Sequence, residues 1–288
     1  SFTGDGVSNW DTSSVTTLGG TFMGATSFTG ASVSEWDTSS VVDMGYTFAK
    51  LSLFTGKSVT KWNTSKVTSL DRTFYKSTAF TGDGVANWDT SNVTNLAWAF
   101  NGATSFTGDG VSNWDTSKVT TLSDTFWRAT SFTGDGVSNW DTSSVKSLQS
   151  AFAYATSFTG DGVSNWDTSS VTSLFGTFAD SSFNGDLSRW NTASVTSMHA
   201  TFSGSAFTDN SIANWDTSNV TDLSYIFYEI SSSFDPENIY GWNIRNVLSC
   251  EKIFEDSDLT DCEKFELYEA WSNQSSAFQN NYSAWEYL

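Results

Sequence analysis

A tandem repeat constrains the fold of this chain more than any other feature of its sequence. One tryptophan marks each unit, at Trp10, Trp36, Trp62, Trp88, Trp114, Trp140, Trp166, Trp190, Trp215 and Trp242. The first seven are evenly spaced, and the last three intervals are slightly shorter or longer. A period of this length is typical of stacked supersecondary units that pack only on their neighbours. We therefore expect one solenoid with a shared core over residues 1–260, rather than two average domains.

The beginning of each unit has the alternation of a short β-strand. In the first unit Trp10 and Thr12 alternate with Asp11. Because successive side chains of a strand point to opposite faces, we expect the tryptophan and the threonine to face the core and the aspartate to face solvent. Stacked units would then share one parallel sheet along the solenoid.

The second half of each unit has the spacing of a short helix. Val15, Leu18 and Phe22 fall at i, i+3 and i+7, which predicts an apolar stripe of about two helical turns. Ser13 stands where an N-cap belongs. We therefore expect a repeat solenoid of the α/β, leucine-rich-repeat-like class, with about ten units of 24–27 residues, each with one short parallel strand and one short helix. A β-helix without helices is the alternative architecture, and the four-residue gap between leucine and phenylalanine favours the helical one.

The repeat also resembles a known family. Its pattern W-[DN]-T-S-x-V-T-x-[LM]-x-x-T-F, closely copied by residues 88–96, is similar to the repeat of BspA-like leucine-rich-repeat surface proteins, W-D-V-S-N-V-T-D-M-x-x-M-F. The resemblance covers about residues 1–260 and implies a secreted or cell-surface protein, often an adhesive one. The sequence departs from the family in placing Thr12 and Thr38 at a usually apolar position and in its strong acidity.

Charge and hydropathy narrow the range of partners. The chain has 32 acidic and 13 basic residues, a formal net charge of −19. Such a charge repels phosphate, so we expect no nucleic-acid partner. No apolar run approaches the roughly 20 residues that span a bilayer, so we expect no membrane insertion. Because residues 1–6 match the tail of a repeat, we expect a mature product or an excerpt of a longer protein.

The repeat fades toward the C-terminus, where residues 261–288 have a different pattern. Their apolar residues have helical spacing in two sets: Phe265, Tyr268 and Trp271, then Phe278, Tyr282, Trp285 and Leu288. A solenoid needs a terminal unit that covers its core, so this segment is the predicted helical cap.

Two cysteines, Cys250 and Cys262, lie at the junction with this cap. In a surface protein we expect them to form one disulfide, worth about 2–3 kcal/mol for a loop this short. Two buried free thiols are the alternative. With a single histidine, they do not make a typical structural zinc site.

An acidic row follows from the repeat, since Asp89, Asp115, Asp141 and Asp167 occupy the same position in consecutive units. Neighbouring charges one strand apart repel by about 1 kcal/mol in water, so the row needs compensation. One interpretation is calcium held between units, because hard cations take oxygen ligands. The other is that each carboxylate accepts the amides of the following turn. Asn63 and other asparagines at this position favour the turn interpretation.

Aromatic residues stand near the inward phenylalanine of many units: Tyr46, Tyr75, Trp98, Trp127, Tyr154, Phe175, Tyr225 and Tyr228. On a helix these rings would be at least partly exposed, and exposed aromatic clusters often recognise protein or sugar. The first five are the candidate ligand-binding residues. Packing between neighbouring units along the stack is an equally good explanation of these rings.

We expect no enzyme. His199 is the only histidine, and the many aspartates and serines occupy repeated scaffold positions instead of one distinct constellation. The sequence therefore predicts a non-catalytic, extracellular or cell-surface adhesion and recognition module that binds a surface protein or a polysaccharide. It predicts no cofactor, with calcium as the one open possibility. The alternative is a structural protein of a surface filament, coat or appendage that self-associates through its repeats.

Overall fold

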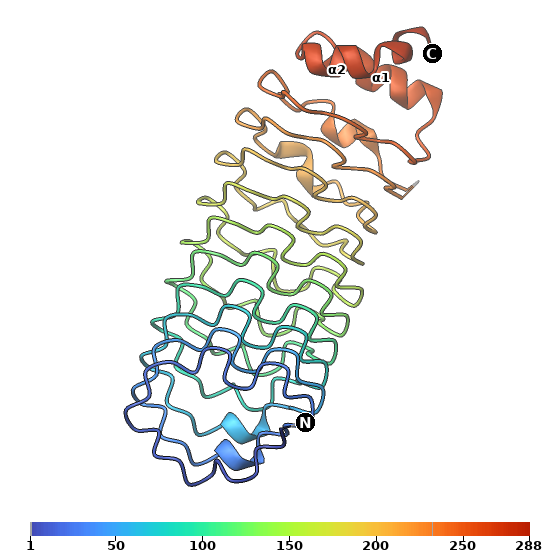
Figure 1. Cartoon of the computed structure of the whole chain (residues 1–288). Helices are drawn as coiled ribbons and strands as arrows, with labels where there is room; N and C mark the ends of the chain where they lie inside the picture. The colour runs from blue at the N-terminus through green and yellow to red at the C-terminus, as the bar shows by residue number, and fades with distance from the viewer. Residues whose placement is uncertain (1, 232) are drawn as a thin grey trace.

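The computed structural model describes residues 2–231 and 233–288 and shows a single stack of coils with the two termini at opposite ends (Figure 1). Each coil is one repeat unit, and the following unit lies directly on it. The tandem repeat of the sequence is therefore also the repeat of the structure.

The predicted strand of each unit does not form. Within the described residues the units meet in isolated parallel bridges, one residue per unit: Thr17, Asp43, Ser69, Asn95, Thr121, Ser147, Ser173, Ser197, Asp222 and Ser249. None of these bridges extends into a strand, so no sheet runs along the described part of the stack. The expected α/β, leucine-rich-repeat-like class is therefore wrong, and a β-helix is not formed either.

The prediction of a short helix in each unit is also wrong. In its place lies what we call the turn ribbon, comprising residues 18–25, 44–51, 70–77, 96–103, 122–129, 148–155, 174–181, 198–205, 223–230 and 250–257. Its N–H groups donate alternately within the unit and to the next unit. Thr21 donates to Leu18 O at 3.0 Å, whereas Phe22 donates to Thr47 O at 3.0 Å. An α-helix would use both N–H groups within the unit, so the bonds to the next unit take the place of a helix.

Left-handed residues complete this departure from a helix. Gly20 has φ 67° and Gly24 has φ 74°, and equivalent positions in later units are also left-handed. Consecutive turns of this kind bring every fourth residue inward, so they produce the same apolar spacing as a helix. Ser13 is likewise no N-cap, because its N–H and hydroxyl both donate to Asp11 Oδ1, at 3.1 and 2.7 Å.

The core consists of aromatic columns that run the length of the stack. Most consecutive tryptophans stack on one another, as Trp114 and Trp140 do with ring centroids 6.4 Å apart. A phenylalanine pair fills the rest of each unit, for example Phe126 and Phe132 at 4.0 Å. Most indole N–H groups of the column donate to a carbonyl of the preceding unit, which satisfies a buried donor.

The threonine that replaces an apolar residue in the repeat has a structural role. Thr38 is buried, and its hydroxyl donates to Asn63 O of the next unit at 3.0 Å. The same bond links Thr116 to Asp141. Threonine therefore gives most units one more connection to the next unit, which an apolar residue could not make.

Short 3-10 helices precede the tryptophan in four units: η1 (Ala31–Val33), η2 (Lys57–Val59), η3 (Ser211–Asn214) and η4 (Pro236–Ile239). Two α-helices, α1 (Asp261–Trp271) and α2 (Ser276–Asn281), and the 3-10 helix η5 (Ser283–Tyr287) cover the C-terminal end of the stack (Figure 1). Trp271 stacks on Trp242 at 6.3 Å, so α1 continues the tryptophan column by one ring. No helix in the described part of the chain has the length and apolar character needed to cross a membrane.

Candidate functional site

The aspartate row lies on the solvent side of the stack, where each carboxylate closes a local turn. Asp115 Oδ1 accepts from the backbone N–H of Ser117 at 3.0 Å and from its hydroxyl at 2.6 Å. The bond from the backbone N–H recurs at Asp89, Asp141 and Asp167. These local donors compensate the repulsion between stacked carboxylates.

The contacts of this row agree with the turn interpretation. Asn63 and Asn191 accept the equivalent amide at 3.1 and 3.0 Å, although they carry no charge. Hydrogen bonds from serine hold the pKa values of Asp89 and Asp115 below the ordinary aspartate range. Across residues 2–231 and 233–288, no group of three or more histidine, cysteine, aspartate or glutamate side chains could hold a metal ion. Calcium binding by this row stays a prediction.

The predicted disulfide is not formed, since both cysteines are free. Cys250 occupies the inward leucine position of the last turn ribbon, where burial raises the pKa of its thiol. Cys262 is exposed in the first turn of α1. The thiols therefore lie in different environments, one in the core and one in solvent.

The five predicted rings all lie on the turn ribbons, on the outward side. Tyr46, Trp98 and Tyr154 occupy left-handed positions with φ of 58°, 60° and 59°, and Tyr75 and Trp127 each precede one. Four of the rings are half-buried, and Tyr154 is 38% exposed. Each ring is thus partly packed along the stack and partly open to solvent, and ligand binding by these rings stays a prediction.

Two arginines gather these rings into two neighbouring groups, one around Arg72 and one around Arg128, which the sequence reasoning missed. We call the two groups together the ring strip, and it consists of Tyr46, Arg72, Tyr75, Trp98, Trp127, Arg128 and Tyr154. The sequence did contain a signal for this arrangement. Residues 46, 72 and 98 are spaced by one period of the repeat, so they occupy the same position in three consecutive units and stack.

Arg72 lies between two rings of the strip. Its guanidinium carbon is 5.3 Å from the Tyr46 ring centroid and 4.9 Å from that of Trp98. The carboxylate of Asp71 accepts from Arg72 Nη1 at 3.0 and 2.8 Å. These contacts hold the cation and the two rings in place.

Arg128 makes the equivalent arrangement farther along the strip. Its guanidinium carbon is 4.3 Å from the Trp127 ring and 5.0 Å from the Tyr154 ring. The two rings meet edge to face at 5.6 Å. The charge of Asp180 raises the pKa of Tyr154, so its hydroxyl stays protonated and can donate a hydrogen bond.

A buried carboxylate lies within the same row as Arg72 and Trp98. Asp124 is 7% exposed and left-handed at φ 55°. Burial raises its pKa to about 6, and the positive charge of Arg72 opposes that shift. The charge close to Arg72 therefore changes in the mildly acidic range.

A hollow of about 560 Å³ opens at the N-terminal end of the strip. Its lining residues are Gly19, Gly20, Met23, Asp43, Gly45, Tyr46, Ser69 and Asp71. It exists because the glycines leave outward positions of two units without side chains. A partner side chain could enter it and contact the Tyr46 ring.

His199 lies on the outward face of a later unit. Its ring stacks on Phe175 at 4.6 Å, and Nδ1 is 3.5 Å from Asp222 Oδ2. It therefore continues the row of outward aromatic rings, and these contacts are those of a packed surface residue.

Comparison with known proteins identifies one family. The model of a family described as "Mycoplasma protein of unknown function, DUF285" matches residues 1–95, 68–180 and 159–265. The three overlapping matches together span the repeats. No curated protein and no solved structure matches the chain.

Proposed function

This chain belongs to the DUF285 repeat family, and we propose that its solenoid is a non-catalytic module of the cell surface or extracellular space that binds another protein through the ring strip. The observation that carries the proposal is the strip itself, in which five half-open rings on consecutive units are packed into two groups, one around Arg72 and one around Arg128. The likeness of the repeat sequence to BspA-like surface proteins supports this location.

The composition of the strip favours a protein over a sugar. Tyrosine, tryptophan and arginine are the residues most enriched among those that dominate binding energy at protein interfaces. Arg72 covers one face of Tyr46 and one face of Trp98, so these rings offer fewer open faces to a flat sugar ring. Polysaccharide is accordingly the second ligand class to test.

Charge also favours a partner that offers acceptors to the strip. The molecule as a whole is acidic, with a net charge of −19, yet the strip displays Arg72 and Arg128. Their free N–H groups can donate to carbonyl or carboxylate oxygens of a partner. The hollow beside Tyr46 provides an anchor point for one partner side chain.

The test is a binding screen with a matched pair of variants. The wild-type chain and a Trp98→Ala/Trp127→Ala variant are applied to arrays of purified extracellular proteins and of polysaccharides. We expect the wild type to bind at least one protein and the variant to bind it about 10- to 100-fold more weakly, as expected when two such residues are truncated. Circular dichroism and the melting temperature should show that the variant remains folded.

Leu248→Ala is the control, since Leu248 is 79% exposed but lies outside the strip. Equal binding by the double variant would refute the assignment of the strip. Binding to polysaccharide alone would refute the protein ligand. If the chain formed large particles in sedimentation velocity and bound to neither array, a structural role would be indicated and the recognition function would be refuted.

A further inference from the structure

Within the last turn ribbon, residues 250–257, some backbone N–H groups have no hydrogen-bond acceptor. In every earlier turn ribbon the equivalent N–H groups donate to the next unit, as Tyr225 does to Glu251 O at 2.9 Å and Phe227 to Ile253 O at 3.0 Å. In the last ribbon these donors belong to Lys252 and Phe254, and no acceptor for either exists among residues 2–231 and 233–288. A row of unpaired backbone groups at an edge is a template for another chain.

The helical cap leaves this edge open. Trp271 covers the tryptophan column, but the cap contacts the ribbon backbone through Tyr282. The hydroxyl of Tyr282 accepts from Ile253 N–H at 2.7 Å and donates to Cys250 O at 3.0 Å. The cap is therefore anchored to one turn of the ribbon and does not supply the carbonyl groups of a further unit.

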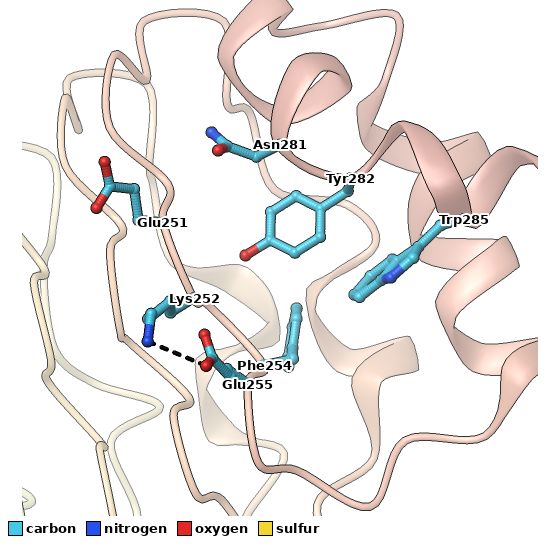
Figure 2. Close-up of a pocket in the computed structure, with 7 residues that line it drawn as sticks. All are labelled: Glu251, Lys252, Phe254, Glu255, Asn281, Tyr282 and Trp285. Carbon is cyan, nitrogen blue, oxygen red and sulfur yellow. Dashed lines mark hydrogen bonds and ion pairs between the residues drawn. The ribbon is translucent and has the colours of Figure 1, made fainter.

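A hollow of about 480 Å³ lies beside that contact (Figure 2). Its lining residues are Glu251, Lys252, Phe254, Glu255, Asn281, Tyr282 and Trp285. Figure 2 shows the Tyr282 and Trp285 rings on one side and the two carboxylates on the other. The residues with open N–H groups, Lys252 and Phe254, form part of the lining.

The charges of the hollow favour a cation. Lys252 Nζ pairs with Glu255 Oε1 at 3.0 Å, which neutralises one carboxylate. Glu251 has no cationic partner within the described part of the chain. An anion such as phosphate would satisfy the open N–H groups but would be repelled by these carboxylates.

We propose that this hollow binds, in trans, an extended peptide segment that carries a lysine or arginine. Its backbone carbonyls accept from Lys252 and Phe254 as the next unit does elsewhere in the stack, its basic side chain pairs with Glu251, and its apolar part packs on Trp285. This is strand addition in the general sense, with backbone bonds giving affinity and a side-chain pocket giving selectivity. The site lies outside the ring strip and does not depend on the function of the strip.

Hydrogen exchange measured by mass spectrometry tests the proposal on the intact chain. The probe is a pool of acetylated and amidated hexapeptides with lysine fixed at one position and uncharged residues elsewhere. We expect the pool to slow exchange of the open amides of Lys252 and Phe254, followed in fragments covering 250–257, by about tenfold or more. Fragments covering 223–230, whose equivalent amides are already paired, should not change.

A matched pool with glutamine in place of lysine should have a much smaller effect. Glu251→Gln should weaken binding of the lysine pool about two- to fivefold, the size of one exposed ion pair. Glu269→Gln, on the exposed face of α1, is the control and should bind normally. The Trp98→Ala/Trp127→Ala variant should also bind the pool normally, which separates this site from the ring strip.

Three results would overturn the proposal. Equal protection by the glutamine pool would refute the requirement for a basic side chain in the peptide. Protection by a neutral oligosaccharide such as maltohexaose, but by no peptide, would refute the peptide. Unchanged exchange in 250–257 with every probe would refute the site.

Discussion

Aspartate has two opposite roles at the scale of the single residue. Asp115 is exposed and accepts two hydrogen bonds from Ser117, so its pKa is lowered and its charge is favoured. Asp124 is buried in the row of Arg72 and Trp98, so its pKa is raised to about 6 and its neutral form is favoured. The first kind of aspartate stabilises the fold above the ordinary aspartate range, and the second stabilises it below about pH 6.

Asp124→Asn should separate these two contributions. Because the folded-state pKa of Asp124 lies above the unfolded value, its contribution is fully present below the unfolded value and is lost as the pH rises through about 6. Asparagine stays neutral throughout. At pH 7 the variant should therefore be more stable than wild type by about 1 kcal/mol, allowing for solvent screening, and the gain should vanish near pH 4.

Urea unfolding at pH 4 and at pH 7 measures this difference, and the other aspartates contribute equally to both proteins. Asp161→Asn, at an exposed turn, is the control for the loss of one negative charge. A gain of equal size at both pH values would contradict the titration of Asp124.

The turn ribbon is the element that distinguishes this fold. It brings Leu18 and Phe22 inward with the spacing of a helix but places a left-handed residue between and after them. Some units have glycine at these positions, and others have Tyr46, Trp98 or Asp124. A non-glycine residue there costs about 1–2 kcal/mol. Five of the seven residues of the ring strip, all except Tyr75 and Trp127, therefore occupy positions where local conformation favours glycine, and their stacking along the solenoid offsets that cost.

Exchanging glycine and alanine at this position should change stability in opposite directions. Ala200 has φ 53° and Gly176 has φ 58°, at the same place in neighbouring units. We expect Ala200→Gly to stabilise the chain and Gly176→Ala to destabilise it, each by about 1 kcal/mol. Urea denaturation gives both values.

Ala97→Gly is the matched control, because Ala97 precedes the left-handed Trp98 and is not itself left-handed. The same substitution should there destabilise the chain by about 0.5–1 kcal/mol. If Ala200→Gly and Ala97→Gly had the same sign, the left-handed geometry would not be the cause.

The whole molecule behaves as a one-dimensional stack, because each unit contacts only its neighbours. Trp114 stacks on Trp88 and on Trp140 with the same centroid distance of 6.4 Å, so a unit contacts the preceding and the following unit in the same way. Stability is then approximately the sum of unit and interface terms. The stack also accommodates units that are shorter or longer than the usual period. In these units the indole N–H groups of Trp190 and Trp215 still donate to the preceding unit, and Trp242 still stacks on Trp215.

Deletion of one whole unit should preserve the fold. Removing residues 115–140, which is one full period of the repeat, joins Trp114 to Asp141 in the register of a normal unit. We expect the circular dichroism spectrum per residue to be unchanged and the unfolding transition to shift only modestly. Deleting residues 115–127, half a period, is the control and should abolish cooperative unfolding, because every later side chain would lose its place in the columns.

Except in the first unit, whose predicted core residue Trp10 is 58% exposed, the sequence by itself determined which repeat positions face the core and which face solvent. The period places each tryptophan on the one before it, and the rings of the strip were predicted to lie on the outward face, where they do lie. The asparagines at the aspartate position indicated a local turn before any contact was known. These properties follow from apolar spacing and from repetition, which both lie in the sequence.

Only the tertiary structure decided how the backbone satisfies its hydrogen bonds. A four-residue apolar spacing suits a helix and two consecutive turns equally well. In the folded chain the N–H of Phe22 donates to the carbonyl of Thr47 in the next unit, and not to a carbonyl of its own unit. Stacking likewise brought Arg72 between Tyr46 and Trp98, and it separated Cys250 in the core from Cys262 in solvent. For Phe22 and for Arg72 the deciding neighbour is about one unit away along the chain, where local spacing carries no information about it.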